Sequence, residues 1–241
     1  MATLQLLGFG PTGWGALLLV AALMTLCVTA VALAIGAVLG AIVAAAKLSS
    51  NFFLIALGNA YTTVFRGVPE LLIIYLIYFG GSSAVTAIGK SFGYEGFLGL
   101  PSFAAGALAV GIISGAYQAE VFRGAFLAIP KGELEAASAI GMHRGMRFRR
   151  IIMPQVLRLA IPGMGNVWQL SLKDSALISV TGLAELMRTS QVAAGSTRQY
   201  FLFFIVGGCL YLILTSLSDR VFTGAERRAN RSMPAAAMGR A

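Results

Sequence analysis

One segment of the chain carries charged, small and helix-ending residues at spacings that suit contact with a partner. Glu135, Ala136 and Ala137 are followed, four positions after the last of them, by Gly141. A carboxylate near a helix start is favoured by the helix dipole, and alanine is the strongest helix former. Glycine commonly ends a helix in the left-handed conformation. We therefore expect a short, exposed helix with a nearly smooth face that ends at Gly141.

The residues that flank this short helix suggest how it is held. Pro130 suits a helix start, and a second, basic helix is expected to run from His143 to Pro154. A short helix that is held at both ends can be bound by a partner protein and can transmit a movement of that partner. The alternative is an ordinary interfacial helix on acidic lipid headgroups, which the arginines of this segment would also favour.

A second set of polar residues lies inside an apolar stretch. Asn166, Gln169 and Lys173 are spaced i, i+3 and i+7, so they share one face of a helix. This stripe fits a substrate-lining surface and fits equally well a set of hydrogen bonds between helices, with Lys173 reaching outward. Asp174 is rotated by about 100° from Lys173, so these two side chains do not share one face of a regular helix.

Two further carboxylates are candidates for a substrate pathway. Glu120 follows Tyr117 by one helical turn and also lies close to Arg123. It either meets a substrate or, as we favour, forms an ion pair at the membrane boundary. Glu70 follows a break in the chain at Pro69 and is a candidate gate residue.

Residues for catalysis or metal binding are not grouped in this sequence. Gly89-Lys90-Ser91 has the form of the end of a phosphate-binding loop, but Ala84 stands where that motif needs glycine. Cys27 and Cys209 lie in apolar runs, and with the single His143 they make neither a disulfide framework nor a metal site. We expect no catalytic residue, metal or cofactor in this chain, and no ATPase site of its own.

Composition places the chain in a membrane. Of its 241 residues 58% are hydrophobic and only 11% are charged, with a mean hydropathy of +0.82. Soluble domains carry about 25% charged residues. The net charge of +9 could indicate nucleic acid, but the first 46 residues hold no charged side chain at all. We therefore expect no nucleic-acid partner and a single transmembrane domain over residues 1–241.

Charge-free stretches of roughly 20 residues mark the expected membrane helices. We expect spans at about 14–46, within the 55–89 region, and at 98–122, 159–184 and 199–219, with a loop over 123–158. The run 48–65 is only moderately apolar, and the residues leave open whether it crosses on its own. Five spans would place the N-terminus outside, whereas six would place it inside.

Basic residues set the orientation, because cytoplasmic loops are rich in lysine and arginine. The loop 123–158 has a clear excess of basic over acidic side chains, and so has the tail from Asp219 onward, which holds Arg220, Arg227, Arg228, Arg231 and Arg240. Both segments are therefore expected in the cytoplasm, with the C-terminus inside.

The loop resembles a known signature. Glu135-Ala136-Ala137, Gly141, Ile151, Met153 and Pro154 match the spacing E-A-A-x3-G-x9-I-x-L-P of permease subunits of bacterial ABC importers, with methionine in place of the usual leucine. Three other segments resemble the polar amino-acid branch of these permeases, especially those for histidine, arginine, lysine, glutamine and opines: Tyr61–Glu70, Phe122–Ala125 and Leu172–Leu177.

This resemblance implies an all-α integral membrane protein of the type I importer fold, with five transmembrane helices and a cytoplasmic coupling loop. It implies a bacterial inner-membrane location, a periplasmic N-terminus and a cytoplasmic C-terminus. The implied partners are a second homologous permease or a second copy of this chain, two ATP-binding subunits that bind ATP and Mg, and a periplasmic substrate-binding protein. The implied ATPase-coupling residues are Glu135, Ala136, Ala137 and Gly141.

The resemblance also suggests the cargo, which would be a basic amino acid or an opine. The candidate pathway residues remain Asn166, Gln169, Lys173, Asp174, Glu120 and Glu70. The alternative function is a self-contained secondary transporter or channel. Such a protein would have internal repeats and carboxylates for ion relay at mid-span, and we find neither clearly.

Overall fold

The structure, a computed structural model, describes residues 5–10 and 13–230, and these contain helices and no strand. The long helices are α2 (Gly15–Lys47), α6 (Ser102–Leu127), α9 (Met153–Asp174) and α11 (Tyr200–Asn230). The shorter ones are α3 (Phe52–Gly67), α4 (Glu70–Tyr75), α5 (Gly81–Ser91), α7 (Lys131–Ala139), α8 (Arg144–Arg147) and α10 (Leu186–Thr197). Two π-helical turns, η1 (Leu76–Gly80) and η2 (Phe148–Ile152), and the 3-10 helix η3 (Ser175–Thr181) complete the order.

Four helical segments of the described chain are long and apolar enough to cross a membrane: Gly15–Lys47, Glu70–Ser91, Ser102–Leu127 and Tyr200–Asn230. The expected span at 159–184 lies instead on α9 and η3, where Pro162 and several polar residues lower the hydropathy. The all-helical membrane architecture is thus confirmed, whereas the count of five spans stays a prediction.

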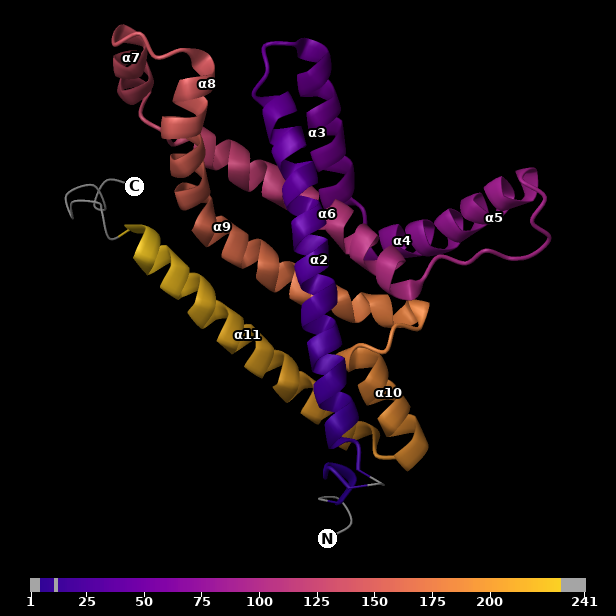
Figure 1. Ribbon diagram of the computed structural model, residues 1–241. Helices are drawn as coiled ribbons and strands as arrows, with labels where there is room; N and C mark the ends of the chain where they lie inside the picture. Colours follow the sequence, from indigo (N-terminus) through magenta and orange to yellow (C-terminus); the bar gives the residue numbers. More distant parts are fainter. Residues whose placement is uncertain (1–4, 11–12, 231–241) are drawn as a thin grey trace.

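The moderately apolar run 48–65 forms a helix of its own. This helix, α3, has 16 residues, fewer than the roughly 20 that a span needs. It ends at Gly67, and Val68 is extended with φ −91° and ψ 138°, as a residue before proline prefers. The break expected at Pro69 is therefore confirmed. From Glu70 onward, α4, η1 and α5 follow one another as an arm that projects from the body (Figure 1).

Four glycines let α2 and α6 cross at close range in the centre of the molecule. Gly36 and Gly40 on α2 lie against Gly115 of α6, and Gly111 of α6 lies against Ala32 and Ile35 of α2. A Cβ atom at Gly40 would lie 3.0 Å from the backbone nitrogen of Ala119 and 3.1 Å from the carbonyl oxygen of Gly115. Small residues of this kind let helix backbones approach closely in membranes, where packing rather than hydrophobicity drives association.

Buried polar side chains strengthen the same crossing. The Ser114 hydroxyl donates to the carbonyl of Ala32 at 3.4 Å, and the Gln118 amide donates to the carbonyl of Leu33 at 3.1 Å. Both side chains are almost fully buried. Apolar residues of α2, α4, α6 and η3 pack around the crossing, with Val28, Ala32, Ile74, Ala107, Ala109, Val110 and Ile178 at the centre.

A second core lies where α10 and α11 pack on the start of α2. The backbone N–H of Leu186 donates to the buried Thr25 hydroxyl at 3.1 Å, and Trp14 meets Phe203 edge to face. The apolar members of this core are Leu18, Ala22, Leu186, Ala193, Ala194 and Phe203. This core fixes the α10–α11 corner against α2.

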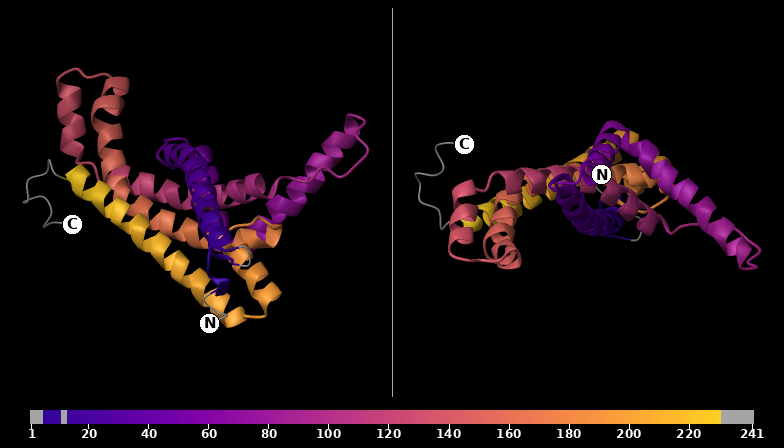
Figure 2. Two further views of the ribbon diagram at one scale, coloured as in Figure 1. Left: turned by 60° about the horizontal axis from the view of Figure 1, so that its bottom comes forward. Right: turned by 90° about the horizontal axis from the view of Figure 1, so that it is seen from above.

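The two basic segments lie at the same end of the molecule. Helices α7 and α8 lie near the C-terminal end of α11, whereas α10 and the start of α2 lie at the opposite end (Figures 1 and 2). The Arg158 guanidinium also donates to the side chain of Asn230 at 3.3 Å. Part of the basic tail, Arg231 and Arg240, lies outside the described residues.

The glycine crossing predicts that Gly40→Ala destabilises the protein. The added methyl group would press on the α6 backbone, and overpacking of this kind costs about 1–3 kcal/mol. The matched control is Gly208→Ala on α11, where a Cβ atom meets nothing within 4 Å. Thermal unfolding in detergent measures both variants. A Gly40→Ala variant as stable as Gly208→Ala would contradict the close crossing.

Candidate functional site

The short helix of the basic segment ends as its glycine predicts. Helix α7 stops at Ala139, and Gly141 has φ +80°, in the left-handed region. The N–H of Gly141 donates to the carbonyl of Ser138, and the N–H of Met142 donates to the carbonyl of Ala137, both at 3.0 Å. This pair of hydrogen bonds is a Schellman motif, which satisfies the last carbonyls of the helix and turns the chain.

The predicted coupling residues take different positions on α7. Glu135, Ala136 and Gly141 are exposed, whereas Ala137 is only 3% exposed. Ala136 and Ala137 also line a groove of about 420 Å³ between α7 and the helix that follows it. Ile140 at the helix end is 77% exposed. The helix thus presents a short outer surface with little side-chain bulk and one apolar side chain.

Side chains brace α7 against the next helix. Arg147 forms a close hydrogen bond with the Ser138 hydroxyl, and Gln155 forms one with the Glu133 carboxylate. The Nδ1 atom of His143 accepts from the N–H of Met146 at 3.3 Å and caps α8. These contacts hold α7 as a unit beside the chain that leads back to the membrane.

The prediction that the second basic helix ends at Pro154 is wrong. Helices α8, η2 and α9 follow one another without interruption from Arg144 to Asp174. Proline lacks an N–H and normally clashes with the preceding turn, but Pro154 is the second residue of α9 and follows directly on the π-helical turn η2. A π-helical turn changes the hydrogen-bond pattern locally. The loop is therefore joined by one helical path to the polar residues of α9.

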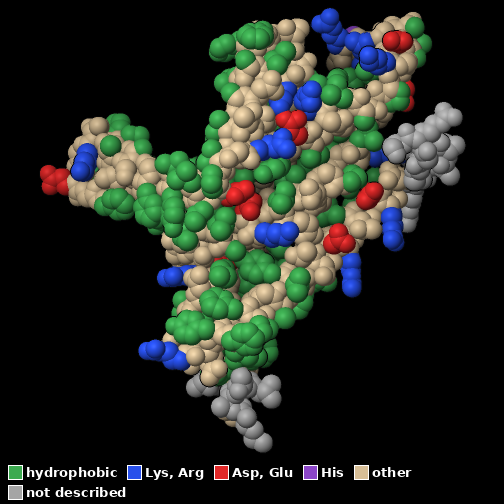
Figure 3. All heavy atoms as spheres, turned by 180° about the vertical axis from the view of Figure 1, so that it is seen from behind, with side chains coloured by type: hydrophobic (Ala, Val, Ile, Leu, Met, Phe, Trp, Pro, Cys, Tyr) green, Lys and Arg blue, Asp and Glu red, His purple; other side chains and the backbone are tan. Residues whose placement is uncertain are grey.

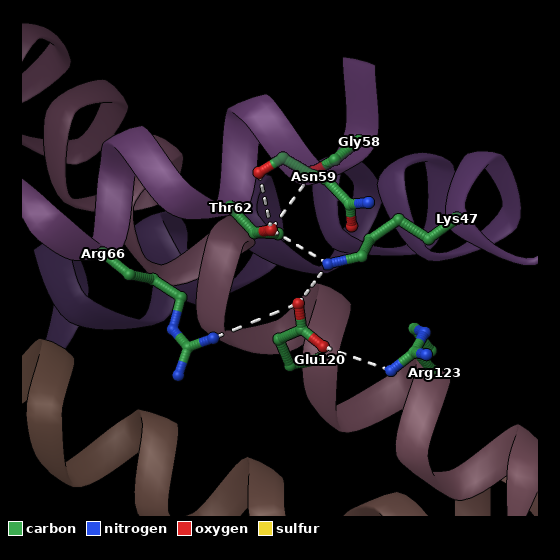
Figure 4. Close-up of polar contacts among 7 residues, drawn as sticks. All are labelled: Lys47, Gly58, Asn59, Thr62, Arg66, Glu120 and Arg123. Carbon is green, nitrogen blue, oxygen red and sulfur yellow. Dashed lines mark hydrogen bonds and ion pairs between the residues drawn. The ribbon is translucent and has the colours of Figure 1, made fainter. Parts of the chain in front are cut away.

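Glu120 lies at the centre of a charged cluster, which comprises Lys47, Thr62, Arg66, Glu120 and Arg123 (Figure 4). Lys47 forms a close ion pair with Glu120 and donates to the Thr62 hydroxyl at 2.9 Å. The guanidinium groups of Arg66 and Arg123 lie 4.0 and 3.7 Å from the Glu120 carboxylate. We call this group the Glu120 cluster.

The Glu120 cluster ties three helices together. Lys47 comes from the end of α2, Thr62 and Arg66 come from α3, and Glu120 and Arg123 come from α6. The Lys47 side chain is only 7% exposed. A further hydrogen bond joins α3 to α6, because the Tyr61 hydroxyl donates to the carbonyl of Ile112 at 2.7 Å.

The ion pair predicted between Glu120 and Arg123 is present, but the sequence reasoning missed its other partners. Lys47 is 73 positions from Glu120, and no local pattern connects them. Tyr117 precedes Glu120 by one helical turn, and its ring lies under the Arg66 guanidinium. The guanidinium carbon is 5.3 Å from the centre of the Tyr117 ring.

Of the polar residues of α9, one forms a hydrogen bond to a neighbouring helix and two are exposed. Gln169 donates to the carbonyl of Thr215 on α11 at 3.2 Å, which is the hydrogen bond between helices that we considered. Asn166 and Lys173 are exposed. Lys173 borders a cavity of about 640 Å³ between α9, α10 and α11, and with Gln169 it borders a second one of about 460 Å³.

Asp174 and Glu70 come within electrostatic range of each other, although 104 positions separate them in the sequence. Asp174 ends α9, Glu70 begins α4, and both are half-buried. The structure therefore brings together Glu70, Lys173 and Asp174 of the candidate pathway residues, while Glu120 belongs to its own cluster.

Glu185 is a buried carboxylate that the sequence analysis missed. It caps α10 by accepting from the N–H groups of Met187 at 2.8 Å and Arg188 at 2.6 Å. The Tyr211 hydroxyl of α11 donates to it at 2.9 Å. Glutamate is not among the preferred capping residues, so only the tertiary structure reveals this role. The carboxylate joins α10 to α11.

Charged side chains also mark one face of the molecule. In Figure 3, basic and acidic side chains alternate along the middle of this face, from the region of α2 and α3 toward the opposite end. Charged residues inside membrane segments usually face a bundle interior or a water-filled cavity. This face therefore suits a hydrophilic path or a partner surface better than lipid. Among the described residues no group of His, Cys, Asp and Glu could hold a metal ion.

The Glu120 cluster predicts an order of stability. Glu120→Gln leaves three cations without an anion, whereas Lys47→Met leaves Glu120 beside two arginines. Glu120→Gln should therefore cost more, about 1–3 kcal/mol. Adding Lys47→Met to Glu120→Gln should recover part of the loss, because it removes one unpaired cation. A double-mutant cycle by thermal unfolding tests this, and purely additive losses would contradict it.

Comparison with known proteins identifies the family. Residues 36–231 match the family described as "Binding-protein-dependent transport system inner membrane component". The octopine transport system permease protein OccQ of Rhizobium meliloti is 52% identical, with 97% of this chain and 98% of that protein covered. The histidine/lysine/arginine/ornithine transport system permease protein HisQ of Escherichia coli is 41% identical, with 90% and 94% covered.

A solved structure shares the fold. A chain of an amino acid ABC transporter crystallised with histidines superposes with a TM-score of 0.75 at 33% identity, covering 89% of this chain and 95% of that one. A chain of the methionine transporter MetNI, at 19% identity and a TM-score of 0.72, shows the fold alone. The chain therefore belongs to the family of binding-protein-dependent transport system inner membrane components, the permease subunits of ABC importers.

Proposed function

We propose that this chain is the transmembrane subunit of an ATP-driven importer for basic amino acids or opines, and that α7 couples it to a separate ATPase. The observation that carries the coupling role is the geometry of α7, an exposed helix with a Schellman end, braced at the start of the α8–η2–α9 path. Family membership sets aside the alternative of a self-contained transporter or channel.

The substrate class is supported by the relatives. Those with high identity over almost their whole length are named for transport of octopine, nopaline, or histidine, lysine, arginine and ornithine. These compounds carry both an amino or guanidino group and a carboxylate. The half-buried carboxylates of Glu70 and Asp174 are the groups that would suit a cationic moiety. We place Asn166 and Lys173 on the same pathway and Gln169 and Glu120 in its wall.

The proposed assembly follows from the same family. Two permease chains, homologous or identical, would enclose the pathway. Two ATP-binding subunits would bind ATP and Mg on the cytoplasmic side, next to α7. A periplasmic binding protein would deliver the substrate at the opposite end. We place the chain in the bacterial inner membrane with five spans, a periplasmic N-terminus and a cytoplasmic C-terminus, as the shared location of both basic segments supports.

The coupling role predicts that Gly141→Val abolishes uptake while membrane insertion persists. A β-branched residue in the left-handed region is strained by roughly 1–2 kcal/mol, so the chain after α7 is redirected and the helix no longer fits its partner. Gly141→Asn is the matched control, since asparagine tolerates this conformation, and it should retain clearly more uptake. Substrate uptake and co-purification of the ATPase are measured together. Normal uptake by Gly141→Val would show that α7 is not the transmission element.

A further inference from the structure

Two arginines of the Glu120 cluster have hydrogen-bonding capacity to spare. Among the described residues neither the Arg66 nor the Arg123 guanidinium donates a hydrogen bond, and their distances to Glu120 are 4.0 and 3.7 Å. The close partner of Glu120 is Lys47, which also donates to Thr62. One carboxylate thus faces three cations, and the two arginine charges exceed what Glu120 neutralises.

Both guanidinium groups are accessible. The side chains of Arg66 and Arg123 are 45% and 41% exposed, in contrast to the buried Lys47. Arg66 is also held in place, because its guanidinium stacks over the ring of Tyr117. A fixed, exposed guanidinium with unused N–H groups matches the two oxygens of a carboxylate or phosphate.

The surroundings of Arg66 favour a solute rather than a lipid. In the second half of α3 the exposed residues Asn59, Thr63 and Arg66 follow at i, i+4 and i+7 and form one polar stripe. Leu57 and Val64, also exposed, lie on the opposite side of the helix by the same helical geometry. The apolar side suits lipid tails, so the polar side with Arg66 faces away from them and toward water or a partner.

We propose that Arg66, supported by the charge of Arg123, binds the carboxylate of the transported solute, while Lys47 keeps Glu120 neutralised. This inference rests on the proposed function and adds to it a recognition site for an anionic group. The solute would be a zwitterionic amino compound, whose cationic end is free to meet other residues of the pathway. A purely cationic analogue without a carboxylate would not engage this site.

The test uses the permease assembled with its ATPase subunits, in nanodiscs of phosphatidylcholine. Phenylglyoxal modifies accessible arginines, and mass spectrometry of the peptides gives a rate for each one. L-arginine should slow modification of Arg66 at least about five-fold, whereas agmatine, which has the same guanidinium but no carboxylate, should not. Arg228, exposed on α11, is the internal control and should react equally in all samples.

Three results would overturn the proposal. They are equal rates with and without L-arginine, equal protection by agmatine, and protection by phosphatidylglycerol in the absence of any solute, which would indicate a lipid site. Uptake of L-arginine by the complete transporter is measured in parallel. Uptake without protection refutes this site alone, whereas absence of uptake refutes the proposed substrate class on which it rests.

Substitution of Arg66 provides a second test of the proposal. Arg66→Gln should reduce L-arginine uptake more than about ten-fold while ATPase co-purification and thermal stability stay near wild type, because it lowers the excess of positive charge in the cluster. Arg228→Gln should leave uptake unchanged. Normal uptake by Arg66→Gln would contradict a role in solute binding.

Discussion

Gly36 and Gly40 on α2 leave almost no space between their backbone and that of α6 around Gly115. Because neither helix can shift toward the other, the relative position of α2 and α6 is fixed by backbone contact rather than by adaptable side chains. Everything that these two helices carry is then placed by the crossing. Helix α2 brings Lys47 to its end, and α6 brings Glu120 to meet it and then leads into the loop that holds α7.

The crossing and the Glu120 cluster make a connected framework around the loop. On one side of α7 the chain leaves α6, which is bound to α2 and α3 through Lys47, Thr62 and Tyr61. On the other side it enters the α8–η2–α9 path, which leads to Lys173 and Asp174. We propose that a displacement of α7 is passed through these connections to both α6 and α9. A helix that hung from flexible linkers would not pass it on.

The sequence predicted features that depend on neighbouring residues in the chain. The end of α7 followed from the conformation that Gly141 needs, the break at Pro69 from the restriction on the residue before proline, and the Glu120–Arg123 pair from their i, i+3 spacing. Features that depend on distant segments were missed. Lys47 meets Glu120 only after α2 and α6 cross, and Glu185 gains its role only when Tyr211 of α11 reaches it.

The helix through Pro154 shows a third limit to what the sequence alone predicts. Proline is a sound signal for a helix end when the helix is regular, but a π-helical turn just before it changes which carbonyl groups need a partner. Whether the helix ends at the proline or continues through a π-helical turn depends on how the preceding residues pack. The local sequence does not determine this packing. The consequence is functional, since an interrupted helix would have separated the loop from α9.

The most direct measurement of the central claim is photo-crosslinking from an exposed position on α7. A benzophenone is attached to a single cysteine introduced by Ala136→Cys, after Cys27 and Cys209 are replaced by serine, and the control position is Ala87→Cys on the exposed surface of α5. With the ATPase subunit present, the cysteine at position 136 should give an adduct with it, and the cysteine at position 87 should not. An ATPase adduct from position 87 and none from position 136 would contradict the assignment of α7 as the coupling element.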